Sequence, residues 1–165
     1  MNFTKAQNIV FKAICTNDRV CKFQIDDNHI FVTHDGMVGF VFPVEIISFN
    51  VEKTTDMKPI PISEIVKPEN RLIITNDLKL TDFGRKMCRR FKINGRSVFI
   101  DKKFLEYFQN AKFYQDRDHD LTPVIVTEDL SAAKRDMPVG VICPTRFYNH
   151  EGYYTDEKEG KCNDC

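Results

Sequence analysis

The chain has 165 residues, of which 24 are basic and 24 acidic, so its formal net charge at neutral pH is zero. This length suits one domain with an adequate core. The overall charge gives no reason to expect or to exclude a polyanionic partner, so only local clusters of charge can indicate one. With 42% hydrophobic and 29% charged residues, the composition is that of an ordinary soluble globular protein.

The sequence carries no recognisable export or membrane signal. Residues 1–5 lack the basic start and apolar run of a signal peptide. No apolar stretch approaches the length needed to span a bilayer. We therefore expect a cytoplasmic protein with no membrane partner, and we expect reduced, buried thiols at Cys15, Cys21, Cys88 and Cys143.

The first half is predicted to be a helix followed by strands. Thr4 and Gln7 form a capping-box pattern, and the apolar stripe behind them predicts a helix over residues 5–15. From residue 20 the period changes to that of strands, and Asp26-Asp27-Asn28 indicates the turn of a hairpin. A third strand is expected over 38–42 and a fourth over 44–51.

Residues 52–70 are predicted to connect the two halves. The prolines of Lys58-Pro59-Ile60-Pro61 and of Lys67-Pro68 interrupt any long element and leave at most a short helix around 63–66. The apolar residues of this connection predict that it packs against the body of the domain.

The second half is predicted to begin with strands at 71–75 and 78–80, separated by a turn at Asn76-Asp77. A strand over 85–93 follows, then the strong hairpin signal Asn94-Gly95 and a strand over 97–100. Asp101 is the expected N-cap of a second helix, whose apolar stripe is Phe104, Leu105, Phe108 and Ala111. Closing strands are expected at 113–115, 124–127 and 139–143, and residues 148–165 form a polar tail.

Met37-Val38-Gly39-Phe40-Val41-Phe42-Pro43 recurs in altered form as Met137-Pro138-Val139-Gly140-Val141-Ile142-Cys143-Pro144. Each copy lies downstream of a predicted amphipathic helix. The sequence therefore predicts an α+β domain over residues 1–147 with two pseudo-symmetric halves, about 1–51 and 71–147. In each half, one helix would pack on antiparallel strands.

Three segments of the second half carry a resemblance to a known family. They are residues 97–108, the strand that begins Pro123-Val124, and residues 139–147, which close in Cys143-Pro144-Thr145-Arg146-Phe147. This pattern resembles the last domain of bacterial DNA polymerase sliding clamps. The first half is similar to the amino-terminal repeat of such a domain, so the resemblance covers roughly residues 3–50 and 95–147. It implies a clamp-like fold, DNA replication or repair as the setting, and duplex DNA and replication proteins as partners.

The chain departs from the clamp pattern in its domain count, tail and charge. A clamp subunit carries three such domains, whereas this chain has room for one. The tail continues past the point where the family usually stops, and the chain is neutral although clamps are generally acidic. A closed ring would need several copies of this chain or another partner, so homo-oligomerisation is a hypothesis.

The candidate DNA-binding residues are basic. A cluster of Lys and Arg lies along residues 85–96 and includes Arg89 and Arg90; such clusters attract phosphates. In a clamp-like domain the helices face DNA, which implicates Lys5, Lys12, Lys102, Lys103 and Lys112. The competing interpretation of the cluster, which we favour on the sequence alone, is a solvated edge strand that its charges protect from pairing.

The remaining constellations give no positive indication of catalysis, of a cofactor or of a metal site. Cys162 and Cys165 have the spacing of half a zinc site, but only His150 lies nearby. His29 and His34 are expected on opposite faces of a strand. His119 lies among Asp116, Asp118 and Asp120, a pattern more often found in a hydrated turn than in a metal site. The alternatives to a DNA-binding clamp are a protein-interaction module of phage or mobile-element origin that contacts a host factor and, third, a small metal-dependent enzyme that uses His119.

Overall fold

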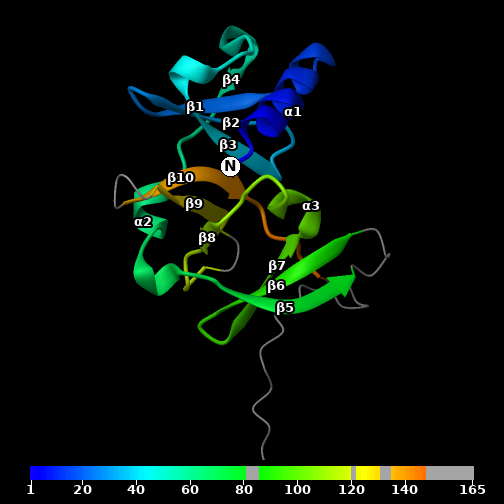
Figure 1. Ribbon diagram of the computed structural model, residues 1–165, viewed down its shortest axis with the longest axis vertical. Coiled ribbons are helices and arrows are strands. Elements are labelled where there is room, and N and C mark those ends of the chain that lie inside the picture. Colours follow the sequence, from blue (N-terminus) through cyan, green and yellow to red (C-terminus); the bar gives the residue numbers. More distant parts are fainter. Residues whose placement is uncertain (81–85, 120–121, 131–134, 148–165) are drawn as a thin grey trace, which may run out of the picture.

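Two β-sheets organise the domain (Figure 1). The computed structural model describes residues 1–80, 86–119, 122–130 and 135–147. Within these residues the large sheet has seven strands, in the spatial order β4 (Thr55–Asp56), β1 (Cys21–Asp26), β2 (His29–Thr33), β3 (Val38–Pro43), β10 (Arg135–Ile142), β9 (Val124–Leu130) and β8 (Ala111–Tyr114). The small sheet has three strands, β5 (Ile73–Leu80), β6 (Met87–Ile93) and β7 (Arg96–Asp101). The mixed α+β class predicted from the sequence is confirmed.

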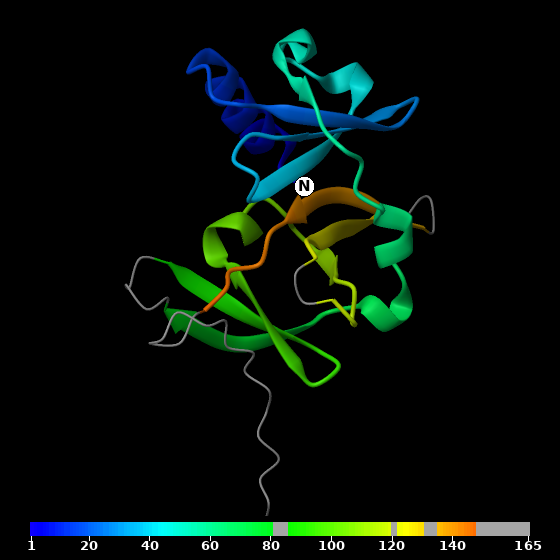
Figure 2. The ribbon, with the colours of Figure 1, turned by 180° about the vertical axis from the view of Figure 1, so that it is seen from behind.

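Helices are few and mostly short. They are α1 (Phe3–Cys15), α2 (Ile62–Ile65), α3 (Lys102–Leu105) and the 3-10 turns η1 (Val44–Ile46), η2 (Val51–Lys53) and η3 (Pro68–Asn70). Views from the front and from behind place α1 and α3 on the same side of the molecule, and α2 on the other side (Figures 1 and 2). Within the described part of the chain, none of the helices has the length and apolar character that a membrane crossing requires.

The start of α1 differs from the prediction. Its N-cap is Asn2, whose side-chain oxygen accepts a hydrogen bond from the Lys5 backbone nitrogen at 3.0 Å. The predicted capping box of Thr4 and Gln7 is therefore wrong. The Gln7 side chain instead donates to the Ile46 carbonyl at 2.9 Å and accepts from the Ser48 backbone nitrogen at 2.8 Å, which ties α1 to the segment after β3.

The hairpin of the first half is confirmed, but the fourth strand is not. The strands β1 and β2 pair antiparallel around the Asp26–Asn28 turn. Residues 44–51 do not form the predicted strand, since they form η1 and lead into η2. In this segment Phe49 is buried against Phe42, with ring centroids 5.5 Å apart. The next strand is the short β4, which pairs parallel with β1.

In the second half, the Asn94-Gly95 turn is confirmed, with φ of 47° and 73°. The predicted turn at Asn76-Asp77 is wrong, since β5 runs through it as one strand. An irregularity in the pairing with β6 between Ile74 and Leu78 accommodates the extra residues.

The second helix has the predicted N-cap but not the predicted length. Asp101 Oδ1 accepts from the Lys103 backbone nitrogen at 3.1 Å. The α-helix ends at Leu105, and single 3-10-type bonds from Tyr107 and Phe108 continue the turn. Asn110 then adopts a positive φ of 50°, and Ala111 begins β8 instead of extending the helix.

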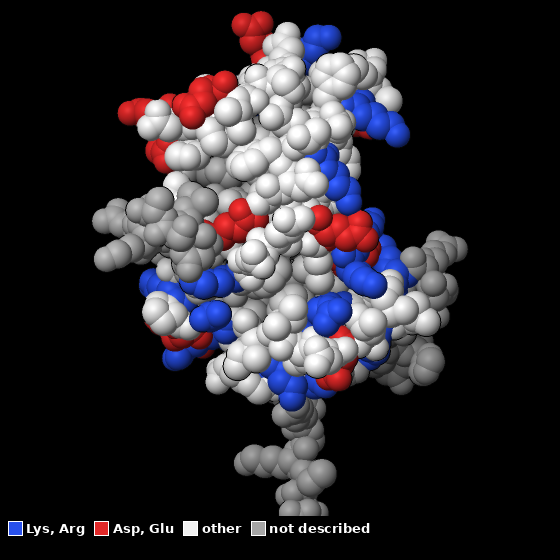
Figure 3. All heavy atoms as spheres, in the orientation of Figure 1, with Lys and Arg blue, Asp and Glu red and all other residues white. Residues whose placement is uncertain are grey.

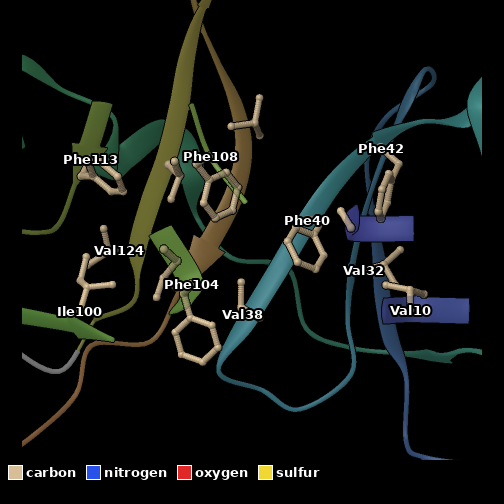
Figure 4. Packing of buried hydrophobic residues seen from close by; sticks show 14 of the residues in the cluster. Val10, Val32, Val38, Phe40, Phe42, Ile100, Phe104, Phe108, Phe113 and Val124 are labelled. Atoms are coloured by element: carbon tan, nitrogen blue, oxygen red, sulfur yellow. The ribbon is translucent and has the colours of Figure 1, made fainter. Parts of the chain in front are cut away.

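Buried side chains cover both faces of the large sheet. On the side of α1 and α3, one cluster of buried residues contains Phe40, with Phe104 and Phe108 to one side of it and Val10 of α1 to the other (Figure 4). On the opposite face, a second cluster brings together Phe31 and Ile65, with the connecting residues Met57, Ile60, Ile62 and Val66 packed against it. The prediction that the connection packs on the body is confirmed.

The two copies of the repeated sequence lie side by side at the centre of the large sheet. β3 and β10 pair antiparallel, with Gly39 opposite Val141 and Phe40 opposite Gly140. Because neighbouring residues of a strand alternate between faces, the glycines of the two copies face opposite sides of the sheet. The repeated sequence therefore lies where the strands of the first half, β1 to β3, meet those of the second half, β8 to β10.

Candidate nucleic-acid interface

The candidate interface is the side of the molecule that carries α1 and α3. Lys5 Nζ lies 2.9 Å from Glu106 Oε2, and the same ammonium lies 4.8 Å from the centroid of the Tyr107 ring. The Asn2 backbone nitrogen donates to the Tyr107 carbonyl at 2.8 Å. These contacts hold the start of α1 against the end of α3, so the two helices present their charged side chains in one region.

Four of the predicted DNA-binding residues belong to these two helices: Lys5 and Lys12 on α1, and Lys102 and Lys103 on α3. All four are exposed. Lys103 Nζ lies 3.7 Å from Asp101 Oδ2 and 4.6 Å from the Phe104 ring centroid, yet 61% of its side chain is accessible. Lys112 was expected on the second helix as well, but it lies on β8, because α3 ends at Leu105.

Charge is unevenly distributed over the surface (Figure 3). Basic side chains are spread over the lower part, where β5, β6 and β7 lie, and continue up the side that α1 and α3 form. Acidic side chains gather on the opposite side of the upper part, near the tip of the β1–β2 hairpin. A polyanion would therefore be attracted to the helix side and to the small sheet.

Glu106 interrupts this basic side. Its pKa is lowered, mainly by the hydrogen bond from Lys5 and then by the charge of that lysine. The carboxylate therefore stays ionised and offsets the charge of Lys5. Asp101 lies near Lys103 in the same way, so the positive charge of the helix side that no carboxylate offsets comes chiefly from Lys12 and Lys102.

The two predicted arginines of β6 lie on opposite faces of the small sheet, as neighbouring residues of a strand must. Arg89 lies on the same face as Phe91 and donates to the Thr75 carbonyl at 3.1 Å. Arg90 donates from Nε to Ser97 Oγ at 2.8 Å and lies 3.5 Å from Asp77 Oδ2. Only Arg89 therefore joins the helix side.

Arg89 and Lys102 line a groove of about 430 Å³ beside α3, together with Leu105 and Phe108. Lys112, on β8, lines the adjoining groove between β5 and β8, together with Arg71. The two grooves share Ile74, Ala111 and Phe113. The structure thus brings Arg89, Lys102 and Lys112 around connected grooves and separates Arg90 from them.

The acidic turn around His119 has local explanations. His119 Nδ1 lies 3.0 Å from Asp116 Oδ2, and the Asp118 backbone nitrogen donates to Asp116 Oδ1 at 2.9 Å. That backbone hydrogen bond is the main cause of the lowered pKa of Asp116. Among the residues the structure describes, no group of three or more His, Cys, Asp or Glu side chains converges as metal ligands would. Asp120, His150, Cys162 and Cys165 lie outside the described residues.

Sequence reasoning missed the exposed apolar side chains. Phe11 on α1 is 52% exposed, and Ile73, Ile74, Leu78 and Leu80 of β5 are all exposed. For β5, the adjacent apolar residues Ile73 and Ile74 were the available sequence signal. Neighbouring residues of a strand face opposite sides, so two adjacent apolar residues cannot both point to a core that covers one side of the strand.

The chain was compared with protein-family models, with curated proteins and with solved structures, and none of the three comparisons found a match.

Proposed function

We propose that the protein is a non-enzymatic, clamp-like factor that binds the backbone of duplex DNA in replication or repair. The observation that supports this function best is the side-by-side position of α1 and α3 on one face of the large sheet, with exposed lysines on both helices. Phosphates would be attracted to these lysines without base-specific contacts.

The proposal includes two related halves. α1 is followed by β1, β2 and β3, and α3 is followed by β8, β9 and β10. In space these strands run β1-β2-β3-β10-β9-β8, so the two helix-and-three-strand units meet at β3 and β10 with mirrored strand order. This order supports a clamp-like architecture. The small sheet, inserted before α3, is an addition to it.

The test is the affinity for a fluorescently labelled DNA duplex, measured by anisotropy over a series of salt concentrations. We expect binding that weakens steeply with salt. Replacing Lys102 and Lys103 together by Glu should weaken binding and lower the slope of log K against log salt by about 2, since each phosphate contact contributes about 0.9.

The matched control reverses two exposed lysines on the other side of the molecule, Lys58→Glu and Lys67→Glu. Their neighbours Met57, Ile60 and Val66 pack against the opposite face of the large sheet. This control should bind DNA nearly as tightly as the unmodified chain. Absence of binding at low salt, or equal losses in the two double variants, would contradict the proposal.

The second candidate is a protein-interaction module, of phage or mobile-element origin, that uses the same fold to contact a host factor. The observation in its favour is the exposure of large apolar side chains around α1, namely Phe3, Phe11, Val44 and Ile46. A DNA backbone offers little for such side chains to bind, whereas clustered exposed apolar residues are typical of protein interfaces.

Cross-linking in cell lysate separates this candidate from the first. A partner protein should be retained by the chain and by the Lys102→Glu/Lys103→Glu variant but lost on Phe11→Ser. Retention of the same proteins by Phe11→Ser would contradict an interface at α1.

A further inference from the structure

β5 is an open edge of the small sheet and carries several exposed aliphatic side chains. Within the described residues it pairs with β6 on one side only. The exposed fractions are 67% for Ile73, 56% for Ile74, 47% for Leu78 and 53% for Leu80. An exposed, apolar edge strand is a ready template for pairing with another chain.

The pairing with β6 decides which face each side chain takes. Ile74, Leu78 and Leu80 lie opposite Phe91, Arg89 and Met87, so they share the inner face of the small sheet, next to the groove beside α3. Lys79 lies opposite Cys88 on the outer face. Asp77 also reaches the outer face, where its carboxylate lies 3.5 Å from the Arg90 guanidinium.

The protection that lysines give an edge strand is weak here. Lysines that project from an edge discourage pairing, but the one lysine of β5 places its ammonium over two aromatic rings. Lys79 Nζ lies 4.6 Å from the Phe147 ring centroid and 5.4 Å from that of Phe99. The irregular part of β5 covers residues 75–77, and regular pairing with β6 resumes at Leu78 and continues to Leu80. Leu78 is therefore the residue at which the irregular part meets the regular part, and the pairing proposed below is centred on it.

We propose that β5 pairs with β5 of a second copy of the chain, antiparallel and centred on Leu78. In this register Asp77 lies opposite Lys79 of the second copy, and Lys79 lies opposite Asp77, because the pairing is symmetric. Oppositely charged pairs across antiparallel strands are stabilising, and like charges directly opposite are destabilising. The two Leu78 side chains face each other on the inner face.

The neighbouring symmetric registers are disfavoured by charge. A pairing centred on Asp77 would place two aspartates opposite each other, and one centred on Lys79 would place two lysines opposite each other. The sequence of β5 is therefore complementary to itself in the proposed register, which identifies the partner as a second copy. An interface of this kind uses the same patch on both copies and closes at a dimer. A larger ring would need an additional contact.

The experiment measures the mass of the full chain in solution, by light scattering or sedimentation, over a wide range of concentration. We expect a monomer–dimer equilibrium. Leu78→Lys should shift it to monomer, whereas Ser63→Lys should not, because it adds the same charge at an exposed position of α2, away from β5.

A charge exchange tests the register. Asp77→Lys alone puts lysines opposite lysines, and Lys79→Asp alone puts aspartates opposite aspartates, so each variant should be monomeric. An equimolar mixture of the two variants restores opposite charges at both positions and should form a heterodimer. Thermal unfolding of each variant verifies that it folds, since the Asp77–Arg90 pair and the Lys79 ring contacts are lost in any case.

Three results would overturn the proposal. They are a chain that stays monomeric at all concentrations, a dimer that Leu78→Lys leaves intact, and a mixture of the two folded charge variants that stays monomeric. Since none of these measurements includes DNA, their outcome is independent of the DNA-binding test.

Discussion

Gly39 and Gly140 lie on adjacent strands, in the same place in each copy of the repeated sequence, but face opposite sides of the sheet. A Cβ atom on Gly39 would collide with the Phe31 ring. A Cβ atom on Gly140 would collide with the Phe108 ring and lie 2.9 Å from the carbonyl oxygen of Gly39. Both glycines are therefore required because a neighbour approaches the backbone closely. On each face of the sheet, a phenylalanine ring thus packs directly against a glycine at the point where β3 pairs with β10.

Gly140→Ala should destabilise the fold by about 1–3 kcal/mol, the usual cost of inserting a methyl group into a filled site. Gly39→Ala should cost less, because a side-chain ring can move more readily than a backbone carbonyl. Urea unfolding followed by fluorescence or circular dichroism measures both. Combining Gly39→Ala with Phe31→Leu should recover part of the loss in a double-mutant cycle, and a Gly140→Ala variant as stable as the unmodified chain would contradict the packing.

Much of the fold could be predicted from the sequence because the strongest signals were local. The Asn94-Gly95 turn adopts positive φ at both residues, and Asp101 caps α3 as its side-chain chemistry indicated. The strand β2 was found from its period and from the turn before it, and β3 and β9 were found as short apolar runs, which burial on both faces produces. At the turn and at the cap, the residue types present strongly prefer the conformation that they adopt.

The missed features depend on tertiary contacts. Asn2, rather than Thr4, caps α1, and the Gln7 side chain binds Ile46 and Ser48, which lie far away in the sequence. The second helix was predicted to extend to Ala111 because its apolar residues have helical spacing. In the structure the α-helix ends at Leu105, and Phe108 is buried after it, with its ring centroid 6.1 Å from that of Phe40. Of the proposed DNA-binding residues, Lys112 was placed on the wrong element because the helix was predicted too long. The strand alternation that separates Arg89 from Arg90 was not applied.

Asp101→Ala should destabilise the fold by about 1 kcal/mol, because α3 loses the acceptor for its Lys103 backbone nitrogen. Asp101→Asn keeps an acceptor oxygen and should lower the stability by only about 0.3 kcal/mol. Urea midpoints of the two variants give the comparison. Equal losses for Ala and Asn would show that the cap is not the source of the effect.

Glu106 is expected to titrate below the ordinary range of a glutamate, because Lys5 donates a hydrogen bond to its carboxylate and so lowers its pKa. Its contribution to stability is therefore present above the pKa of the unfolded chain and is lost as the pH falls through the lower pKa of the folded chain. NMR titration of the Glu106 carboxyl carbon measures this directly. Lys5→Met should raise the pKa of Glu106 towards its usual value, whereas Lys12→Met, on the same helix, should leave it unchanged.

The thiol of Cys88 should be protected from alkylation in the folded protein. Cys88 is fully buried beside Phe99 and Phe147, and burial is the main cause of its raised pKa. The pKa of the Cys143 thiol is also raised by burial, whereas Cys15 is exposed, contrary to the expectation of a buried thiol there. Since the thiolate is the reactive form, iodoacetamide should modify Cys15 first.

The measurement is peptide mass spectrometry over time, in a chain with Cys162→Ser and Cys165→Ser. Cys88 should be modified only as fast as the protein unfolds, so its rate should rise with added urea while that of Cys15 changes little. Because the folded state holds the Cys88 pKa above that of the unfolded chain, its contribution to stability is full at low pH and falls as the pH rises through the folded-state pKa. Modification of Cys88 as fast as Cys15 without denaturant would place that thiol in solvent and contradict the packing of Phe147 over β7.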